Sequence, residues 1–123
     1  MVMAEIRIGR FNMPSKVFLI QSEGLGRGED QLGGLLMANF LRLLGESKEK
    51  PSILVFWNTG VRLVCEGSQV LNHLKRLEEQ GVEILACTTC LEYFDLLDKQ
   101  KIGKPTTMVK SIQSLMSSDM VCL

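Results

Sequence analysis

The 123-residue sequence has no excess of charge of either sign, because 14 Lys and Arg balance 14 Asp and Glu. A chain without net positive charge lacks the long-range field that nucleic-acid binding relies on, so we expect no nucleic-acid partner. It also lacks an apolar run near the ~20 residues of a membrane-spanning helix, and its N-terminus lacks the apolar core of a signal peptide. We therefore expect a soluble cytoplasmic protein with no membrane partner.

Metal and cofactor signatures are missing as well. The one histidine, His73, shows no paired spacing with Cys65 or Cys122, so a zinc site around Cys87 and Cys90 would lack its other ligands. The glycine-rich segment 24–28 lacks the Lys-Ser/Thr of a P-loop and the spacing of a dinucleotide fingerprint. We expect no metal and no organic cofactor.

The hydrophobic pattern predicts the fold class. Apolar runs at 16–22, 51–57, 82–86 and 120–123 are typical of buried strands, and helical patterns lie between them. Such alternation predicts a three-layer α/β/α sandwich with a mostly parallel sheet of about five strands. Segments 4–8 and 61–65 are candidates for an edge strand, and Gly103-Lys104-Pro105 is interpreted as a break. We expect one domain over 16–123, preceded by an N-terminal extension, 1–15.

The helix expected after segment 24–28 is unusually apolar. It begins at Glu29 and Asp30, runs to about Leu44 and is expected to stop at Gly45. Met37 and Leu41 widen its apolar stripe and are assigned outside the side that faces the sheet. A stripe wider than one sheet face covers predicts a homo-oligomer.

Cys87-Thr88-Thr89-Cys90 is the most informative motif, because it joins a predicted strand to a predicted helix. Thr89 followed by Glu92 fits a capping box, which would make Thr89 the N-cap and Cys90 the first helical residue. The positive end of the helix dipole would then favour a Cys90 thiolate. Cys87 is expected to be the last strand residue, more buried and neutral.

The cysteine pair has other interpretations. Both thiols can be small buried residues beside a turn, or they can close a redox-sensing disulfide. A thioredoxin-like pair is disfavoured, because that motif follows the first strand of its unit and needs a later cis-proline, whereas Pro105 is the only later proline here.

Ligands of parallel α/β sheets collect at the carboxyl ends of the strands. Three loops are predicted to meet there, at 23–28, 58–60 and 87–90. The glycine-rich loop is either a tight turn that needs positive φ or a cradle of N–H groups for a small anion. The candidate binding residues are Gly24, Gly26, Arg27, Gly28, Asn58, Gly60, Thr88 and Thr89.

Several motifs in this order resemble one family. They are Gln-Ser-Glu-Gly-Leu-Gly-Arg-Gly-Glu-Asp-Gln-Leu-Gly, Phe-Trp-Asn-Thr-Gly-Val-Arg-Leu, Glu-Gly-Ser and Gly-Val-Glu-Ile-Leu-Ala-Cys-Thr-Thr-Cys-Leu-Glu-Tyr. Over about residues 16–123 the chain resembles the DsrE-like domain of the YedF group, sulfurtransferase-like proteins of selenium metabolism. The resemblance implies a DsrE/YchN-type fold, trimers, hexamers or dimers, and persulfide chemistry at Cys87 and Cys90, with Cys90 preferred.

Two departures from the family matter. The family usually has Cys-Gly-Thr-Cys, whereas Thr88 stands here in the glycine position, where a positive φ would be strained. Full-length relatives carry a preceding TusA-like domain, so here the sulfur donor or acceptor is expected to be a separate protein, TusA-like for example, or a small molecule.

Two functions from different classes follow. One is a sulfur or selenium carrier, a possible sulfurtransferase, that relays a persulfide on Cys90. The alternative is a non-catalytic oligomeric module of the same fold that binds a small anion or a partner, in which the cysteines only pack.

Overall fold

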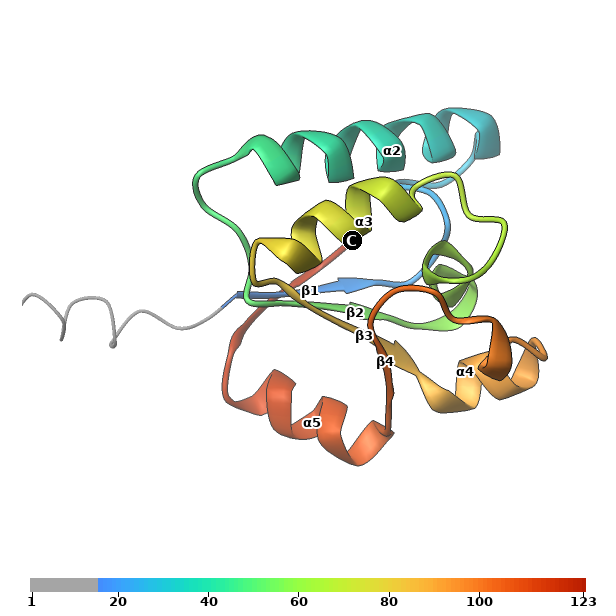
Figure 1. Cartoon of the computed structure of the whole chain (residues 1–123), viewed down its shortest axis with the longest axis vertical. Helices are drawn as coiled ribbons and strands as arrows, with labels where there is room; N and C mark the ends of the chain where they lie inside the picture. The colour runs from blue at the N-terminus through green and yellow to red at the C-terminus, as the bar shows by residue number, and fades with distance from the viewer. Residues whose placement is uncertain (1–15) are drawn as a thin grey trace, which may run out of the picture.

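Among the described residues, a sheet of five parallel strands lies at the centre of the fold, as the sequence predicts (Figure 1). The computed structural model describes residues 16–123, so the predicted extension 1–15 and the possible strand 4–8 lie outside the described residues. The strands are β1 (Lys16–Ile20), β2 (Ile53–Phe56), β3 (Glu83–Cys87), β4 (Lys104–Thr106) and β5 (Asp119–Cys122), in the order β4-β3-β2-β1-β5. Phe18 pairs with Leu54 in parallel register, as predicted.

Helices cover both faces of this sheet. α2 (Asp30–Glu46) and α3 (Leu71–Glu79) lie on one face, and α5 (Met108–Met116) lies on the other (Figure 1). The chain moves along the sheet in one direction from β1 to β4 and then returns to β5, so right-handed crossovers place α5 opposite the first two helices. The short α4 (Thr88–Tyr93) and the 3₁₀ turns η1 (Asn58–Val64) and η2 (Leu97–Lys99) follow the strand ends.

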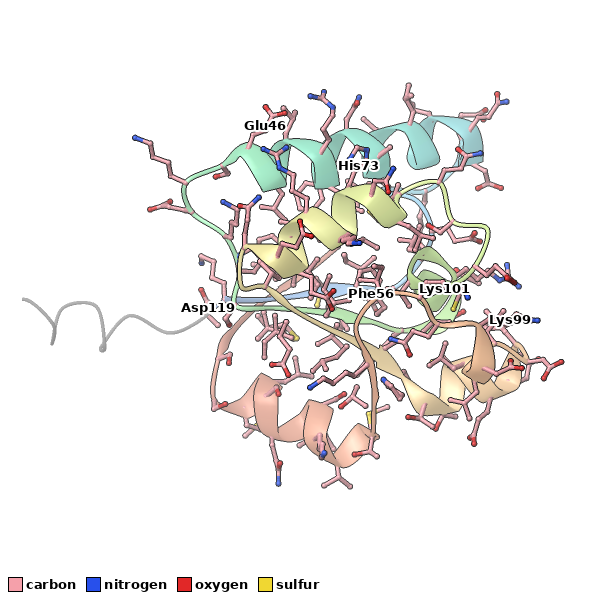
Figure 2. All side chains as sticks on the ribbon, viewed as in Figure 1. Glu46, Phe56, His73, Lys99, Lys101 and Asp119 are labelled. Carbon is pink, nitrogen blue, oxygen red and sulfur yellow. The ribbon has the colours of Figure 1, made fainter. Side chains whose placement is uncertain are left out.

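The two helical layers bury unequal cores. The larger core lies between the sheet and α2 with α3; Phe56, labelled in Figure 2 between the sheet and α3, is completely buried in it. The smaller core, under α5, consists of Val17, Leu19 and Val55 with Leu115 packed against them. Most apolar residues of α5 remain exposed, so this layer contributes less burial to the fold.

The orientation of α2 corrects the sequence interpretation. Met37 and Leu41, assigned outside the sheet-facing side, are buried, together with Gly33 and Gly45 at the same spacing of four. The exposed large apolar residues of α2 are instead leucines, which are between 43% and 60% accessible: Leu32, Leu35, Leu36 and Leu43. α2 packs closely on the glycine-rich loop at Gly33. A Cβ added to Gly24 of this loop would lie only 2.9 Å from the carbonyl carbon of Gly33.

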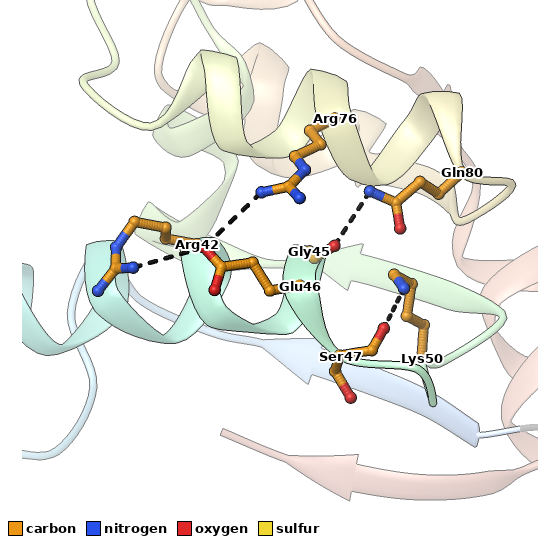
Figure 3. Close-up of polar contacts among 7 residues, drawn as sticks. All are labelled: Arg42, Gly45, Glu46, Ser47, Lys50, Arg76 and Gln80. Atoms are coloured by element: carbon orange, nitrogen blue, oxygen red, sulfur yellow. Dashed lines mark hydrogen bonds and ion pairs between the residues drawn. The ribbon is translucent and has the colours of Figure 1, made fainter.

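The end of α2 is fixed against α3 by polar contacts (Figure 3). The Glu46 carboxylate lies 3.6 Å from Arg42 and 3.9 Å from Arg76, and the Gln80 amide donates to the Gly45 carbonyl at 3.1 Å. The two ion pairs are about half exposed, so they orient the helices more than they stabilise them. Because α2 continues to Glu46, Gly45 lies inside the helix, and the predicted stop at this residue is wrong.

The remaining edge strand lies where a break was predicted. Lys104–Thr106 pairs with β3 as β4, and Pro105 is tolerated because an edge strand leaves one row of N–H groups unpaired. Segment 61–65, the other candidate, is mostly the 3₁₀ turn η1, with one antiparallel bridge from Cys65 to Gln100. Within residues 16–123, no helix is both long and apolar enough to span a bilayer.

Candidate functional site

A cleft of about 1120 Å³ opens at the carboxyl ends of β1, β2 and β3. The three loops that the sequence predicts there all contribute to its lining, and Met108 and Leu123 close it from α5 and the chain end. Of the predicted residues, the lining includes Gly24, Gly26, Arg27, Gly28, Asn58, Cys87 and Cys90. Both thiols therefore lie in one cleft with the glycine-rich loop.

Cys87 both ends β3 and caps α4. Its Sγ accepts a hydrogen bond from the Cys90 N–H at 3.4 Å, and α4 begins at Thr88. The prediction of Thr89 as N-cap is therefore wrong, and Cys90 is the third helical residue rather than the first. The prediction that Cys87 is the more buried thiol is confirmed, since it is 3% exposed while Cys90 is partly exposed.

The backbone of Asn58 points at the Cys90 sulfur. Its N–H donates to Cys90 Sγ at 3.1 Å, across the floor between the ends of β2 and β3. Asn58 has a φ of 53°, a left-handed conformation that asparagine adopts more readily than most residues. Its side-chain Oδ1 accepts from the Thr59 N–H at 2.8 Å and holds this turn. A local turn thus aims one donor at one thiol.

Burial raises the pKa of the Cys90 thiol above its ordinary value. Contact with the Cys87 side chain raises this pKa further, and the Asn58 N–H lowers it only in part. The expected depression of the Cys90 pKa by the helix dipole is therefore wrong. α4 has six residues, so only a few aligned peptide dipoles stand behind the thiol. At neutral pH the group is predominantly a thiol that needs a partner to take its proton.

The glycine-rich loop adopts the tight-turn conformation. Gly26 and Gly28 have φ values of 82° and 110°, and a Cβ on either would meet nothing within 4 Å. These glycines are therefore required by backbone conformation and not by close contact with the rest of the fold. The loop is tied to α2 by the Leu25 N–H, which donates to the Gly33 carbonyl at 3.0 Å.

Three predicted binding residues are not part of the cleft lining: Gly60, Thr88 and Thr89. Gly60 is buried, and a Cβ there would lie 2.5 Å from the Ile20 carbonyl oxygen. The Thr88 hydroxyl donates to the Thr106 carbonyl at 2.9 Å and ties α4 to β4. Thr88 lies in α4 and is not among the residues with positive φ, so the strain anticipated for a threonine in this position does not arise.

The sequence interpretation missed the acidic and aromatic part of the lining. Glu23, Glu29 and Asp30 bring three carboxylates against one guanidinium, that of Arg27. Arg62 pairs with Glu23 at 3.3 Å and lies 4.5 Å from the centre of the Phe94 ring, at the side of α4. The lining therefore has no excess of positive charge to attract a small anion. These carboxylates could have been found from their position beside the predicted strand-end loop.

Trp57, which directly follows β2, also lines the cleft and is not among the binding residues predicted from the sequence. Its indole packs against both hydrophobic cores, and its buried Nε1 has no hydrogen-bond partner within residues 16–123. Trp57 is the chain's one tryptophan, so its fluorescence reports on the cleft.

The other two cysteines lie outside the cleft lining. Cys65 is buried in the larger core, and its thiol donates to the Val61 carbonyl at 3.2 Å. Cys122 is exposed on the edge strand β5. Among the described residues, no cluster of three or more His, Cys, Asp or Glu side chains could hold a metal ion.

Comparison with solved structures identifies the fold. The chain is similar to the YchN protein from E. coli, with a TM-score of 0.69 and 17% sequence identity, over 90% of this chain and 100% of that chain. It is also similar to a protein of unknown function from Methanobacterium thermoautotrophicum, with a TM-score of 0.64 and 18% identity, over 89% and 99% of the two chains. The α/β fold is thus that of YchN-like proteins.

A third structure, a conserved protein of unknown function from Bacteroides thetaiotaomicron, aligns with a TM-score of 0.59 and 15% identity, over 89% of this chain and 95% of that chain. No protein-family model matches the sequence, and a search of curated proteins finds no match. At these identities the likeness shows the fold alone.

Proposed function

We propose that the protein is a sulfur carrier of the DsrE-like type, related to the YedF group, in which Cys90 accepts and passes on a persulfide. The observation that supports this most directly is the Asn58 N–H at 3.1 Å from Cys90 Sγ, in a cleft open to a donor. A fixed N–H donor stabilises the Cys90 sulfur when it carries negative charge, both as the attacking thiolate and as the leaving group when an acceptor takes the outer sulfur.

The loading step uses only the Cys90 sulfur and a donor persulfide. Cys90 Sγ attacks the terminal sulfur of R–S–SH, so a new S–S bond forms on Cys90 while the donor S–S bond breaks. The donor leaves as a thiolate, and this thiolate accepts the proton that Cys90 gives up. Because the pKa of Cys90 is raised, a smaller fraction of this group is thiolate at neutral pH, and the attack is slower than that of an unperturbed cysteine of the same access.

The donor or acceptor is a separate molecule, and a selenium atom can take the place of the transferred sulfur. The lining favours a partner that does not rely on anionic groups, because three carboxylates face one arginine. A TusA-like protein that presents its cysteine on a neutral or basic surface fits this charge, whereas the small-anion form of the alternative function does not.

Mass spectrometry of the purified protein after exposure to glutathione persulfide tests the proposal. We expect a gain of one sulfur atom in the wild-type chain and in Cys122→Ser, and none in Cys90→Ala. Cys122→Ser is the matched control, because it removes an exposed thiol outside the cleft. If Cys90→Ala gains sulfur as readily as the wild type, the carrier assignment fails and the partner-binding module is favoured.

A further inference from the structure

The position of Cys87 gives this buried thiol a role that loading does not use. Its Sγ lies 3.4 Å from the Cys90 backbone nitrogen, and the two side chains are in contact. Cys87 and Cys90 are three residues apart around the first turn of α4, and helix geometry places Cα atoms at that spacing roughly 5 Å apart. Cα separations near this value suit a disulfide without displacement of the backbone.

Access separates the two thiols. Cys87 is 3% exposed, whereas Cys90 is partly exposed toward the cleft. A donor or acceptor in solution therefore reaches Cys90 first, and Cys90 is the neighbour through which Cys87 can react. The N-cap residue Cys87 is therefore the enclosed thiol, and Cys90 inside the helix is the accessible one.

From this arrangement we propose that Cys87 is a resolving cysteine, which attacks the persulfide on Cys90 and releases its outer sulfur as sulfide. The inference rests on the proposed carrier function and specifies how the sulfur leaves when no protein acceptor takes it.

The step is balanced within the chain. Cys87 Sγ forms a bond to Cys90 Sγ, and the bond between Cys90 Sγ and the outer sulfur breaks. The outer sulfur leaves with the bonding electron pair as hydrosulfide and takes up the proton of the Cys87 thiol as hydrogen sulfide. The outer sulfur is reduced and the two cysteine sulfurs are oxidised to a disulfide, so no external oxidant is needed. A dithiol reductant then restores both thiols.

The fold favours attack on the inner sulfur. Cys87 is held at the end of β3, between the sheet and α4, and the Cys90 N–H already fixes its sulfur. A nucleophile held beside its target avoids the loss of freedom that a dissolved thiol would suffer, so resolution competes with release to a dilute external thiol.

The test follows the loaded protein under anaerobic conditions in a Cys122→Ser background, after removal of the glutathione persulfide. We expect the parent to lose its extra sulfur, release one equivalent of sulfide and gain a disulfide, seen as the loss of two hydrogens by mass. Cys87→Ser should still load through Cys90, at a rate that reflects the changed contact with the Cys90 thiol, but once loaded it should keep its persulfide at least about tenfold longer than the parent. Serine is a strong N-cap, so this variant retains the cap on α4.

Cys87→Ala provides a second variant without a hydroxyl, and circular dichroism shows whether each variant folds. Trp57 fluorescence gives an independent readout of disulfide formation, because its indole lines the same cleft. If Cys87→Ser and its parent both load and lose sulfur at the same rate, the resolving role is overturned while the carrier function stands. If no variant loads sulfur, both proposals fail.

Discussion

At the scale of single residues, the place of Cys90 in the cleft depends on which residue caps α4. Two residues were available to cap α4, Thr89 with its capping-box partner Glu92, and Cys87 at the strand end. Cys87 is the cap, and the Thr88 hydroxyl bonds Thr106 of β4 instead of an N–H of its own helix. α4 therefore begins directly at the end of β3, and Cys90 lies two positions further into the helix than predicted, where burial is the largest influence on its pKa.

The pH dependence of Cys90 alkylation follows from that pKa. Because burial raises it above the ordinary value, the thiolate fraction at neutral pH is smaller than for an exposed cysteine. In a Cys122→Ser background we expect the iodoacetamide rate to climb about tenfold per pH unit from pH 7 to pH 9, without a plateau. Peptide mapping should show Cys90 alkylated before Cys87, because of access. A plateau below pH 8 would contradict the raised pKa.

The raised pKa of Cys90 also predicts how the free energy of unfolding changes with pH. A folded-state pKa above the unfolded value means that the neutral thiol contributes stability at neutral pH, and this contribution is lost as pH rises through the folded pKa. Burial also raises the pKa of the Cys65 thiol. We expect the urea midpoint to fall above pH 9, and Cys65→Ala to flatten that fall; an unchanged midpoint up to pH 11 would rule out both shifts.

Asn58 offers a direct test of the turn that faces Cys90. Its φ of 53° is accessible to glycine without strain and costly for a β-branched residue. We expect Asn58→Gly to keep the alkylation rate of Cys90 within about twofold. Asn58→Val should destabilise the protein by about 1–2 kcal/mol in urea unfolding and alter that rate, because the N–H no longer points at the sulfur. Equal stability of the two variants would argue against the left-handed turn.

At the scale of elements, close backbone contacts position the cleft. Gly60 in η1 lies against the Ile20 carbonyl at the end of β1, and that carbonyl also accepts the Trp57 N–H at 3.0 Å. The loop that carries Asn58 is thus held to β1 on both sides. Gly60 is not part of the lining that the sequence analysis assigned to it. It instead packs against β1 and so positions the loop that carries Asn58.

Replacement of Gly60 by alanine should therefore be costly. A Cβ 2.5 Å from a carbonyl oxygen forces the backbone to shift, and we expect a loss of roughly 1–3 kcal/mol in the free energy of unfolding. Gly34→Ala is the matched control, because Gly34 lies in the second turn of α2 and nothing lies within 4 Å of an added Cβ there. That variant should stabilise the protein by about 0.5–1 kcal/mol through helix propensity. Similar losses in both variants would remove the steric explanation.

The sequence predicts some elements better than others, for physical reasons. β1, β2 and β3 are continuous apolar runs because both sheet faces are covered, and their parallel pairing follows from the helices between them. β4 is three residues long and contains Pro105, so its pairing depends on an edge that only the assembled sheet offers. The Asn58 contact with Cys90 joins residues 32 apart, and no local pattern indicates it.

At the scale of the whole molecule, the part of the chain that the structure describes (16–123) exposes two apolar surfaces on opposite sides of the sheet. One is the leucine face of α2, and the other lies on α5, where Val109 is 66% and Met116 is 84% exposed. The α2 face arises because the buried residues of this helix are Gly33, Met37, Leu41 and Gly45, of which Gly33 packs on the loop at 24–25 and Gly45 on α3, so the leucines remain outward. The predicted surplus of apolar surface is thus present, but on leucines rather than on Met37 and Leu41.

We propose that the leucine face of α2 is buried between copies of the chain, so light scattering at micromolar concentration should give a mass above that of the monomer. Leu35→Lys should lower that mass, because Leu35 is 60% exposed at the centre of the face and a lysine there would lie desolvated in an interface. Gln31→Lys adds the same charge to an exposed polar position of the same helix and should leave the mass unchanged.

A variant on α5, Val109→Lys, tests whether the second apolar surface forms the interface instead. If only the α5 variant dissociates the assembly, the interface lies on the other side of the sheet, and a monomeric wild-type chain would contradict self-association altogether.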